Sequence, residues 1–562
     1  MPAPTRPVRL ALTGLLVAAL AACTSSQPQD APSSTPPPPA PTTPPPTTAP
    51  PEPSPTPEPE GQYGVAAGDP AAVAAGMGVL QSGGNAVDAA VAAAFAVAVV
   101  EPFASGIGGG GAAIVVPGGD GTRAVAYDYR EVVADDGVVP PSGTGIPGFV
   151  AGMAALHEAH GQAEWATVLA PAIALAEEGH PVSAMLARRL REDVGPGIVA
   201  ELPQFRSGNG PLAEGDVLVQ EDLARTMRTL AEEGPASFYT GSLAESLTGV
   251  QGIDAGSLAG YEVVSGEPVR GVVGDHEVLA PLPPLPGAPM VQMLQVAHAL
   301  DAGSADPGSL EFVERVSRAW EVADESTGSV LGDPAFVDVP VTELTDPRRN
   351  AALAEDVSAQ ASGGDGTTSA GAAGDTAGNT THISVVDPTG TAVSMTNTLT
   401  HWFGSADHHA GFFLNDQLSR FSAIESPANR PAPGRRSVSW SAPLVVLDDD
   451  ARVVLVIGSP GGRFIPNILT TVYARWAWHG QSLEEAVAAP RFHLEGRTMQ
   501  VEESLPGELR DRLAGRGYAV EVVPGSTYAY GSVNALEVDP GSGRLAGAAD
   551  PRREADYAVA GG

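Results

Sequence analysis

One stretch of this chain, residues 86–100, can only be accommodated inside a folded protein. It reads AVDAAVAAAFAVAVV, so a helix here presents alanine and valine on almost every side. Asn85 is a suitable N-cap for it, and Gly83-Gly84 end an earlier helix that begins at Pro70. A helix with so little polar surface must be covered by other elements. We therefore expect a large folded body around it.

The order of the other predicted elements indicates the fold class. Helices are expected at 149–160, 164–178 and 221–233, and strands at 112–116 and 123–129. A glycine-rich stretch at 362–379 resembles an exposed loop. Strand-like runs follow it, at 382–387, 392–399, 444–447 and 453–457. Helices first and strand pairs later favour an α+β fold with a largely antiparallel sheet over a regular βαβ series.

The first segment is typical of a secretion signal. Residues 1–22 have a positive start, a short apolar run and small residues before a cut, and LAAC at 20–23 resembles the lipobox of bacterial lipoproteins. Cys23 is the only cysteine of the chain, which favours lipidation there over an ordinary secretory signal. Residues 23–61, rich in Pro and Thr, are expected to form a disordered tether. We therefore expect an extracytoplasmic protein that meets the membrane only through a lipid anchor.

Charge and cysteine content exclude several functions. The net charge is 30 − 66 = −36 and no lysine is present, which argues against nucleic-acid binding and against docking on anionic lipid. A single cysteine at position 23 excludes disulfides, a cysteine-based zinc site and a cysteine nucleophile in the body. The absence of lysine excludes Ser-Lys mechanisms.

Several short sequence motifs are present or nearly present, but their spacing or their flanking elements do not fit the function that each motif would indicate. Residues 106–111 satisfy G-x-G-x-x-G, but a helix precedes them and a strand follows, the reverse of a dinucleotide site. His157 and His160 are three residues apart where a zinc helix needs four, so a solvated helix face is the simpler interpretation. The string GSPGG at 458–462 is not G-x-S-x-G. We expect no metal and no cofactor.

The stretch NTTHISVVD at 379–387 contains a candidate catalytic threonine. A threonine becomes a good nucleophile when it is an N-terminus, because its own α-amine can accept the hydroxyl proton. Such an amine titrates near 7.7–8.0, close to working pH. A cut between Asn379 and Thr380 would create this terminus. Taken alone, two threonines at a strand start are also common in structural strands.

Longer sequence matches favour the catalytic interpretation of these threonines over the structural one. The stretches QSGGNAVDAAVAAAFAVAVVEPFASGIGGGG (81–111), YDYRE (127–131), GIPGFVAG (145–152), TTHISVVD (380–387), LNDQ (414–417) and GSPGG (458–462) resemble γ-glutamyltransferases, in that family's order. The resemblance implies an N-terminal-nucleophile hydrolase fold, with two stacked antiparallel sheets between helical layers. It also implies autocleavage into a large subunit (62–379) and a small subunit (380–562), paired as a heterodimer.

The resemblance also implies the site residues. Thr380 would form an acyl-enzyme and pass the acyl group to water or an amine, with Thr398 supporting it by hydrogen bonding. The N–H groups of Gly461 and Gly462 would form an oxyanion hole, whose donors are typically worth about 3–4 kcal/mol each. Arg130 would pair with the substrate carboxylate, for which its planar fork is suited. The family's substrates would be small γ-glutamyl amides of the glutathione type.

Three positions depart from the family pattern where the glutamyl head is recognised. Arg420 stands where an acidic residue usually binds the α-amine, Thr400 replaces an asparagine, and Trp440 replaces the second residue of a serine pair. Ser439 and Gln417 match. The stretch between Phe421 and Arg436 is too short for the usual lid loop, which predicts an open site. The preferred acyl group is therefore open, with a glutaryl-type dicarboxylic group or poly-γ-glutamate as alternatives.

Two other classes stay open at this point. A homologue that has lost turnover could serve as a tethered binding protein, although the retention of Thr380, Thr398 and Gly461-Gly462 argues against it. A solute-binding receptor would also have a lipobox and a tether, but it needs no TTH junction. Cleavage between 379 and 380 discriminates both from the enzyme.

Overall fold

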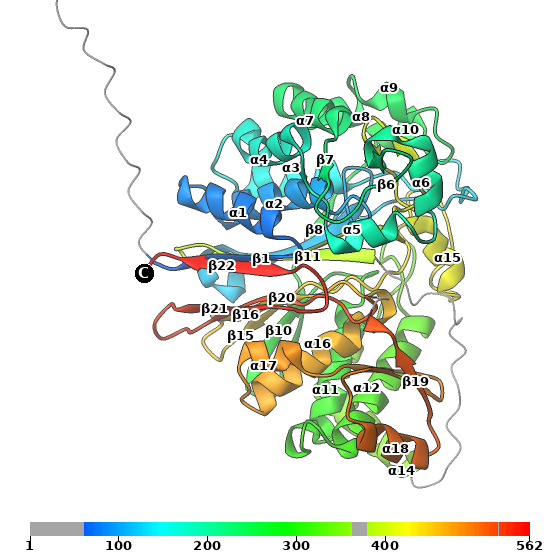
Figure 1. Ribbon diagram of the computed structural model, residues 1–562. Helices are drawn as coiled ribbons and strands as arrows, with labels where there is room; N and C mark the ends of the chain where they lie inside the picture. Colours follow the sequence, from blue (N-terminus) through cyan, green and yellow to red (C-terminus); the bar gives the residue numbers. More distant parts are fainter. Residues whose placement is uncertain (1–60, 362–378, 526–527) are drawn as a thin grey trace, which may run out of the picture. The chain divides into compact units, whose positions relative to one another are not determined.

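The computed structural model describes residues 61–361, 379–525 and 528–562 (Figure 1). The predicted signal segment, Cys23, the tether up to residue 60 and the glycine-rich residues 362–378 lie outside the described residues. None of the helices in the described ranges is both long enough and apolar enough to cross a bilayer.

The first sheet combines strands from both ends of the chain. In the described residues it has seven strands, in the order β22 (Asp556–Ala560), β1 (Tyr63–Ala67), β11 (Asn379–Val386), β12 (Ala392–Thr400), β2 (Gly110–Val116), β3 (Val125–Asp128) and β8 (Val264–Gly266). Every neighbouring pair is antiparallel. The strand predicted after the glycine-rich stretch, β11, therefore lies between the first strand of the body and β12.

The second sheet is stacked on the first (Figure 1). Over the described ranges it has six antiparallel strands, in the order β21 (Leu545–Ala549), β20 (Asn534–Val538), β16 (Val453–Gly458), β15 (Leu444–Leu447), β10 (His276–Ala280) and β9 (Val269–Val273). An apolar cluster that includes Ile114, Val445 and Val456 joins the two sheets. The expected largely antiparallel α+β fold is confirmed.

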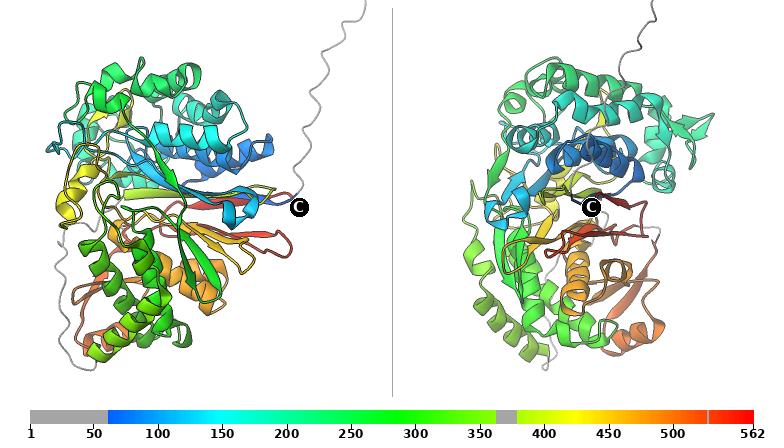
Figure 2. Two further views of the ribbon diagram at one scale, coloured as in Figure 1. Left: turned by 180° about the vertical axis from the view of Figure 1, so that it is seen from behind. Right: turned by 90° about the vertical axis from the view of Figure 1, so that its left-hand side faces the viewer.

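Helices cover the outer face of each sheet, as both views of Figure 2 show. The first layer contains α1 (Pro70–Gln81), α2 (Ala86–Val100), α3 (Phe149–His160), α4 (Trp165–Glu178) and α7 (Glu221–Glu233). All residues of α2 are buried, and Asn85 forms a capping box with Asp88 at its start. The second layer contains α11 (Gly287–Ala299), α12 (Leu310–Ser329), α14 (Pro347–Ala361), α16 (Ile465–Tyr473), α17 (Leu483–Ala488) and α18 (Gly507–Gly515).

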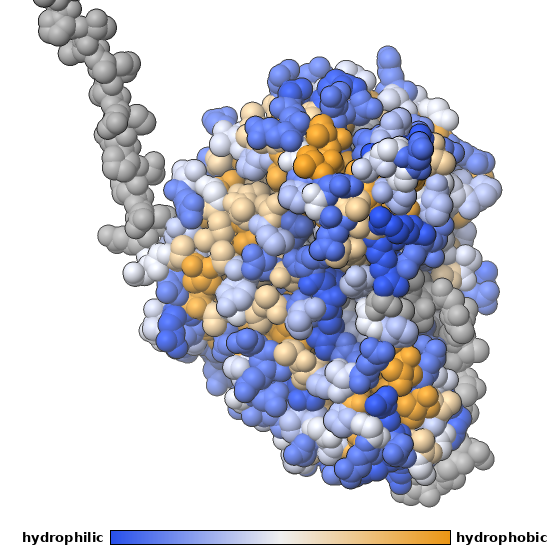
Figure 3. All heavy atoms as spheres, in the orientation of Figure 1, coloured by the Kyte–Doolittle hydropathy of each residue, from blue (hydrophilic) through white to orange (hydrophobic). Residues whose placement is uncertain are grey.

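Shorter elements surround these four layers. The helical turns are α5 (Ala184–Arg189), α6 (Gly195–Glu201), α8 (Ala236–Tyr239), α9 (Ala244–Leu247), α10 (Ala255–Ala259), α13 (Val341–Leu344) and α15 (Arg420–Ala423). The short strands are β4 (His180–Pro181), β5 (Arg206–Ser207), β6 (Gly210–Pro211), β7 (Val217–Leu218), β13 (His408–His409), β14 (Phe412–Phe413), β17 (Phe492–Glu495), β18 (Thr498–Glu502) and β19 (Ala519–Val523). Figure 3 shows that the face seen in Figure 1 is mostly hydrophilic with small apolar patches, as the acidic composition suggests.

The alternation of side chains along β11 and β12 determines what faces the second sheet. Ser384 donates to the carbonyl oxygens of Val456 (3.3 Å) and Asn534 (3.0 Å), both in the second sheet. Ser394 of β12 donates to the Ile457 carbonyl at 3.2 Å. Because side chains two apart share a face, the face of β12 that contains Ser394 also contains Thr398. This face is directed at the second sheet, near the C-terminal end of β16.

Candidate active site

Thr380 lies at the start of β11 in a short relay of hydroxyl groups. Its Oγ1 donates to Oγ1 of Thr398 over 3.4 Å, and the Thr398 hydroxyl in turn donates to the carbonyl oxygen of Asn379. The backbone N–H of Thr400 donates to the same Thr398 oxygen at 2.8 Å. Thr398 thus contacts both the predicted nucleophile and the peptide group that precedes it. Its hydrogen bond polarises the Asn379 carbonyl.

The backbone around this relay is irregular. A register shift interrupts the pairing of β11 with β12 between Asn379 and Thr381, and bulges of this kind re-aim side chains near active sites. Thr400 has φ +87°, which is a strained conformation for a β-branched residue. The side-chain amide of Asn379 also donates, from Nδ2, to the carbonyl oxygen of Phe103. The peptide group before Thr380 is therefore held from several sides.

The two predicted oxyanion-hole glycines follow the end of β16. Gly458 packs on His382 so closely that a Cβ there would lie 2.2 Å from the imidazole. After Ser459-Pro460, Gly461 and Gly462 have φ +138° and +54°, conformations that favour glycine. Gly461 is the N-cap of η6 (Gly462–Phe464), Gly462 is its first residue, and α16 follows, so their N–H groups lie at a helix start, where such groups have no intrahelical partner. The structure thus brings them to the same end of the stacked sheets as Thr380.

Three of the predicted recognition residues form one hydrogen-bonded chain. The Thr400 hydroxyl donates to Oε1 of Gln417, and Nε2 of Gln417 donates to Oγ of Ser437 at 2.9 Å. Nη1 of Arg130 donates to the carbonyl oxygen of Ser437 at 2.7 Å. Together with Thr398, this chain connects Thr380, the predicted nucleophile, to Arg130. Ser437 was not identified from the sequence, because a lone serine in a loop has no distinguishing pattern.

Arg130 is fully buried beside carboxyl groups. Its Nε and Nη2 contact the two carboxylate oxygens of Asp128 at 3.0 and 2.7 Å. Burial alone would raise the pKa of Asp128, but Arg130 and Arg436 together lower it. Burial raises the pKa of the neighbouring Glu131 to about 8. The Nε and Nη2 groups of the Arg130 guanidinium are thus already hydrogen-bonded to Asp128 in this structure.

The remaining predicted recognition residues are buried at different places. Arg420 begins α15, and burial lowers the pKa of its guanidinium to about 10. Ser439 is buried in the loop before β15. The ring of Trp440 lies 5.8 Å from that of Trp320 in the second helical layer, with the Arg463 guanidinium 5.5 Å away. Trp440 therefore lies beside the residue that follows Gly462.

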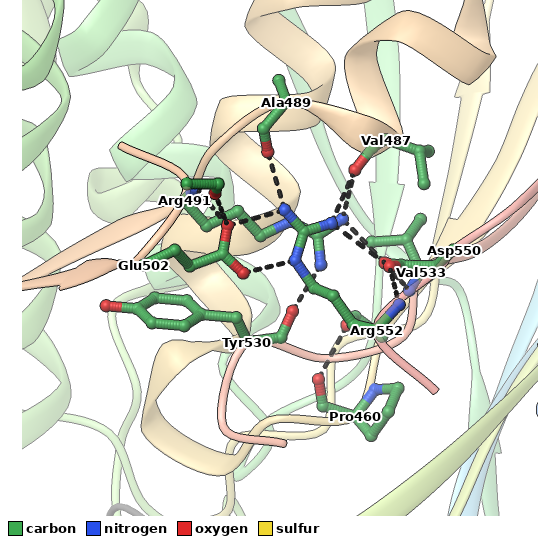
Figure 4. Close-up of polar contacts among 11 residues, drawn as sticks. Pro460, Val487, Ala489, Arg491, Glu502, Tyr530, Val533, Asp550 and Arg552 are labelled. Carbon is green, nitrogen blue, oxygen red and sulfur yellow. Dashed lines mark hydrogen bonds and ion pairs between the residues drawn. The ribbon is translucent and has the colours of Figure 1, made fainter. Parts of the chain in front are cut away.

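The C-terminal segment also contacts Thr380, the predicted nucleophile. Figure 4 shows the Arg552 guanidinium held by Glu502, by Asp550 and by the carbonyl oxygens of Val487 and Ala489. The next residue, Arg553, donates from Nη1 to the carbonyl oxygen of Thr380 at 3.3 Å. This contact spans 173 positions of sequence, and no motif pointed to it.

The rejected motifs have structural roles. Among the described residues, no group of three or more His, Cys, Asp or Glu side chains could hold a metal ion. His157 contacts the carbonyl oxygen of Ala163 at 2.8 Å, and His160 contacts the Tyr127 hydroxyl at 2.8 Å. Both histidines are half-buried and Glu158 and Ala159 between them are exposed, so the face is partly solvated. In the G-x-G-x-x-G stretch, a Cβ on Gly110 would lie 2.7 Å from the carbonyl oxygen of Tyr129, which explains the glycine by packing.

Comparison with known proteins supports the resemblance. Residues 72–560 match the family model described as gamma-glutamyltranspeptidase. The chain is 33% identical over 499 residues to the capsule biosynthesis protein CapD proenzyme of Bacillus anthracis, covering 89% of this chain and 91% of that protein. It is 31% identical over 527 residues to the glutathione hydrolase proenzyme of Escherichia coli (strain K12), covering 87% and 90%.

The fold has a solved counterpart. The crystal structure of cephalosporin acylase from Bacillus halodurans superposes with a TM-score of 0.79 at 23% identity, covering 91% of this chain and 98% of that one. At this identity the similarity concerns the fold alone, the arrangement of two stacked antiparallel sheets between helical layers.

Proposed function

This chain belongs to the gamma-glutamyltranspeptidase family, and we propose that it cuts itself between Asn379 and Thr380 and then uses Thr380 as its nucleophile. It is an enzyme, an acyl transferase and hydrolase of γ-glutamyl and related amides. The observation that supports the proposed cut and nucleophile most directly is the contact of Thr398 with both Thr380 Oγ1 and the Asn379 carbonyl oxygen.

Self-cleavage begins with attack of Thr380 Oγ1 on the carbonyl carbon of Asn379. The C–N bond breaks, the hydroxyl proton moves to the leaving nitrogen, and an ester joins Asn379 to the Thr380 side chain. Water then hydrolyses this ester, which leaves a carboxylate on Asn379 and a free α-amine on Thr380. The hydrogen bond from Thr398 favours the first step, because it withdraws electrons from the attacked carbonyl.

Acyl transfer uses the new terminus. The α-amine accepts the proton of the Thr380 hydroxyl, and Oγ1 attacks the carbonyl carbon of the substrate amide. The N–H groups of Gly461 and Gly462 stabilise the oxyanion. The ammonium then returns the proton to the leaving amine as the C–N bond breaks, and an acyl-enzyme remains. Water or an acceptor amine releases the acyl group and gives the hydroxyl its proton back.

The two product chains are expected to stay together as a heterodimer. In the first sheet, β1 of the large subunit lies between β22 and β11 of the small subunit. In the second sheet, β10 of the large subunit pairs with β15 of the small subunit. Separating the subunits would break both sheets and their shared apolar cluster, which supports a permanent pair.

The acyl group is the open part of the proposal. Thr400, Gln417 and Arg130 are linked through Ser437, which supports a recognition site at this place. Arg420, three residues after Gln417, supplies a positive charge that would repel an α-ammonium and attract a carboxylate. We propose that a glutaryl-type or poly-γ-glutamate acyl group competes with α-amino-γ-glutamyl.

The location is proposed from the N-terminal segment. Lipidation at Cys23 would hold the enzyme at the outer face of the membrane on the tether of residues 23–61. Detergent phase partitioning of the full-length protein tests this. The unaltered protein is expected in the detergent phase and Cys23→Ala in the aqueous phase, whereas equal partitioning would contradict the anchor.

The denaturing intact-mass spectrum of the purified protein tests the cut. Two fragments meeting at Asn379 and Thr380, together with an uncut Thr380→Ala variant, are expected. A chain that stays uncut on prolonged incubation would indicate a homologue that has lost turnover. A Thr380→Ser variant is a matched control, because it retains the hydroxyl and should still cut, although more slowly.

A further inference from the structure

Arg553 brings a positive charge to the residue that becomes the catalytic base. Its Nη1 donates to the carbonyl oxygen of Thr380 at 3.3 Å, and its Nη2 donates to that of Tyr528 at 3.0 Å. The side chain is buried, with its guanidinium 5.6 Å from the centre of the Trp402 ring. Because the acceptor is the carbonyl of Thr380 itself, the contact does not depend on the peptide bond to Asn379. It can persist after the chain is cut.

The preceding residue explains why Arg553 is fixed in place. Arg552 forms two contacts with Glu502, at 2.5 and 2.7 Å, and one with Asp550 at 3.2 Å (Figure 4). Asp550 is also paired with the buried Arg491 at 2.8 Å. This network anchors the backbone at residues 550–552. Arg553 then extends from an anchored segment, so its guanidinium has little freedom to move away from Thr380.

A buried carboxyl group lies beside the same strand, at the end of helix α2. Glu101 follows α2 and is buried, and its carboxylate oxygens lie 3.0 and 3.2 Å from the point where a Cβ of Gly68 would stand. The Thr381 hydroxyl lies 3.0 Å from that same point, so Glu101 and Thr381 are neighbours. Burial raises the pKa of Glu101 to about 7, and the charge of Arg553 opposes that rise. Glu101 and Arg553 thus interact electrostatically beside the start of β11.

We propose that Arg553 and Glu101 set the basicity of the Thr380 α-amine in opposite directions, and so set the pH at which the mature enzyme becomes active. Backbone bond lengths put the amine nitrogen within about 7 Å of the Arg553 guanidinium. A cation at that range disfavours the ammonium form and lowers the amine pKa, whereas a carboxylate raises it. Both are positioning residues, since they act through the amine. This inference rests on the proposed role of Thr380.

Other charged groups surround this pair and stay unchanged in the test. They lie on the turn before α1, on α5, and on the C-terminal segment and β22: Asp69, Arg189, Asp550, Glu554 and Asp556. On β11 itself, burial lowers the pKa of His382 to about 3, so this imidazole is neutral throughout the working range. His401, beyond Thr400, is hydrogen-bonded to Asp416, which raises its pKa. A shift confined to the Arg553 and Glu101 variants would therefore belong to those two residues.

The pH dependence of kcat/KM tests the proposal on fully processed enzyme. Processing of each variant is first verified by intact mass, and activity is then followed with a γ-glutamyl anilide from pH 5 to 10. Arg553→Gln should move the midpoint of the acidic limb up by about one pH unit. Glu101→Gln should move it down, and Arg553→Lys should restore a value close to the original. Arg452→Gln and Glu277→Gln, which alter exposed or half-exposed ion pairs elsewhere, are matched controls expected to leave the limb in place.

Opposite shifts in the two variants would support the proposal, because a merely structural defect would lower activity without moving the limb. Unmoved limbs, or shifts in the same direction, would overturn it. If Arg553→Gln fails to process, Glu101→Gln still decides: a limb that moves down supports the proposal, and an unmoved limb or an upward shift overturns it. Failure of the proposed function is distinguishable, since it would show as an uncut wild-type chain or as activity that survives in Thr380→Ala.

Discussion

The hydroxyl of Thr398 donates a hydrogen bond to the carbonyl oxygen of Asn379. Thr398 accepts one bond from Thr380 Oγ1 and another from the N–H of Thr400, so its single proton is free for that carbonyl. In the proposed mechanism, one side chain would thus orient the attacking oxygen and activate the attacked carbon. This double contact predicts that a single threonine on β12 affects both maturation and turnover.

Replacing Thr398 should therefore slow two reactions. In Thr398→Ala the attacking oxygen loses its acceptor and the Asn379 carbonyl loses its donor. We expect autocleavage and kcat each to fall by about 10²-fold, the scale found when one donor is removed from an oxyanion site. Time courses of the fragments on denaturing gels and steady-state assays measure the two effects. Thr398→Ser retains the hydroxyl and should lose less than tenfold, and equal losses in both variants would contradict the assigned role.

Gly461 should tolerate no side chain. Its φ is +138°, and a Cβ would lie 2.9 Å from Ile468 and 3.0 Å from the carbonyl oxygen of Ala529. Gly461→Ala is expected to displace the N–H groups of the oxyanion hole and to lower kcat by at least 10²-fold. Gly480→Ala is a matched control, because Gly480 also has a positive φ, +63°, but no atom within 4 Å of its Cβ position. A control that loses as much kcat as Gly461→Ala would refute the assignment.

Arg420 should influence which acyl group is preferred. Comparison of a γ-glutamyl anilide with a glutaryl anilide measures the preference as a ratio of kcat/KM values. Arg420→Asp should shift that ratio toward γ-glutamyl by about tenfold or more, since an acidic side chain attracts the α-ammonium that arginine repels. Arg420→Met should give an intermediate ratio. A strong γ-glutamyl preference that is the same in all three proteins would contradict the hypothesis.

Glu131 should make stability fall as pH rises. Folding raises the pKa of this buried carboxyl to about 8, so the folded state binds its proton more tightly than the unfolded chain does. The stabilisation from this group is present in full below the unfolded pKa of about 4.3 and is lost as pH rises through about 8. Urea melts of Glu131→Gln at pH 5 and pH 8 should show a gain over wild type that is larger at pH 8. A gain independent of pH, or one matched by the exposed Glu232→Gln, would argue against it.

Much of the framework followed from local sequence patterns. The ends of α2, α3 and α7 match the predicted ranges, because apolar runs and cap residues determine such helices locally. The strands 392–399 and 453–457 were correct to within one residue of β12 and β16. By contrast, helices such as α11 and α12 were not identified, and nor were the strand pair β9 and β10. Their amphipathic or short patterns become distinctive only once the second sheet is present to cover them.

Only part of the candidate site could be proposed from the sequence, for a physical reason. Glycines and a threonine at a strand start leave a sequence pattern, so Thr380, Gly461 and Gly462 could be proposed from the sequence, and the hydrogen bond between Thr380 and Thr398 is compatible with their proposed roles. Ser437 and Arg553 left none, because their contacts with Gln417 and Thr380 arise from tertiary packing between distant segments. The contact of Arg130 with the Ser437 carbonyl oxygen is also tertiary, because 307 positions separate the two residues, whereas the pairing of Arg130 with Asp128 is local, two residues apart.

The identity of the acylated residue tests the central claim most directly. Processed enzyme is mixed with a γ-glutamyl or glutaryl anilide, quenched in acid within the first turnovers, digested and mapped by mass spectrometry. The account predicts the acyl mass on the peptide that begins at Thr380, on its side-chain oxygen, with the α-amine unmodified. An adduct on any other residue of either subunit, or turnover that continues in a processed enzyme whose Thr380 is blocked, would contradict it.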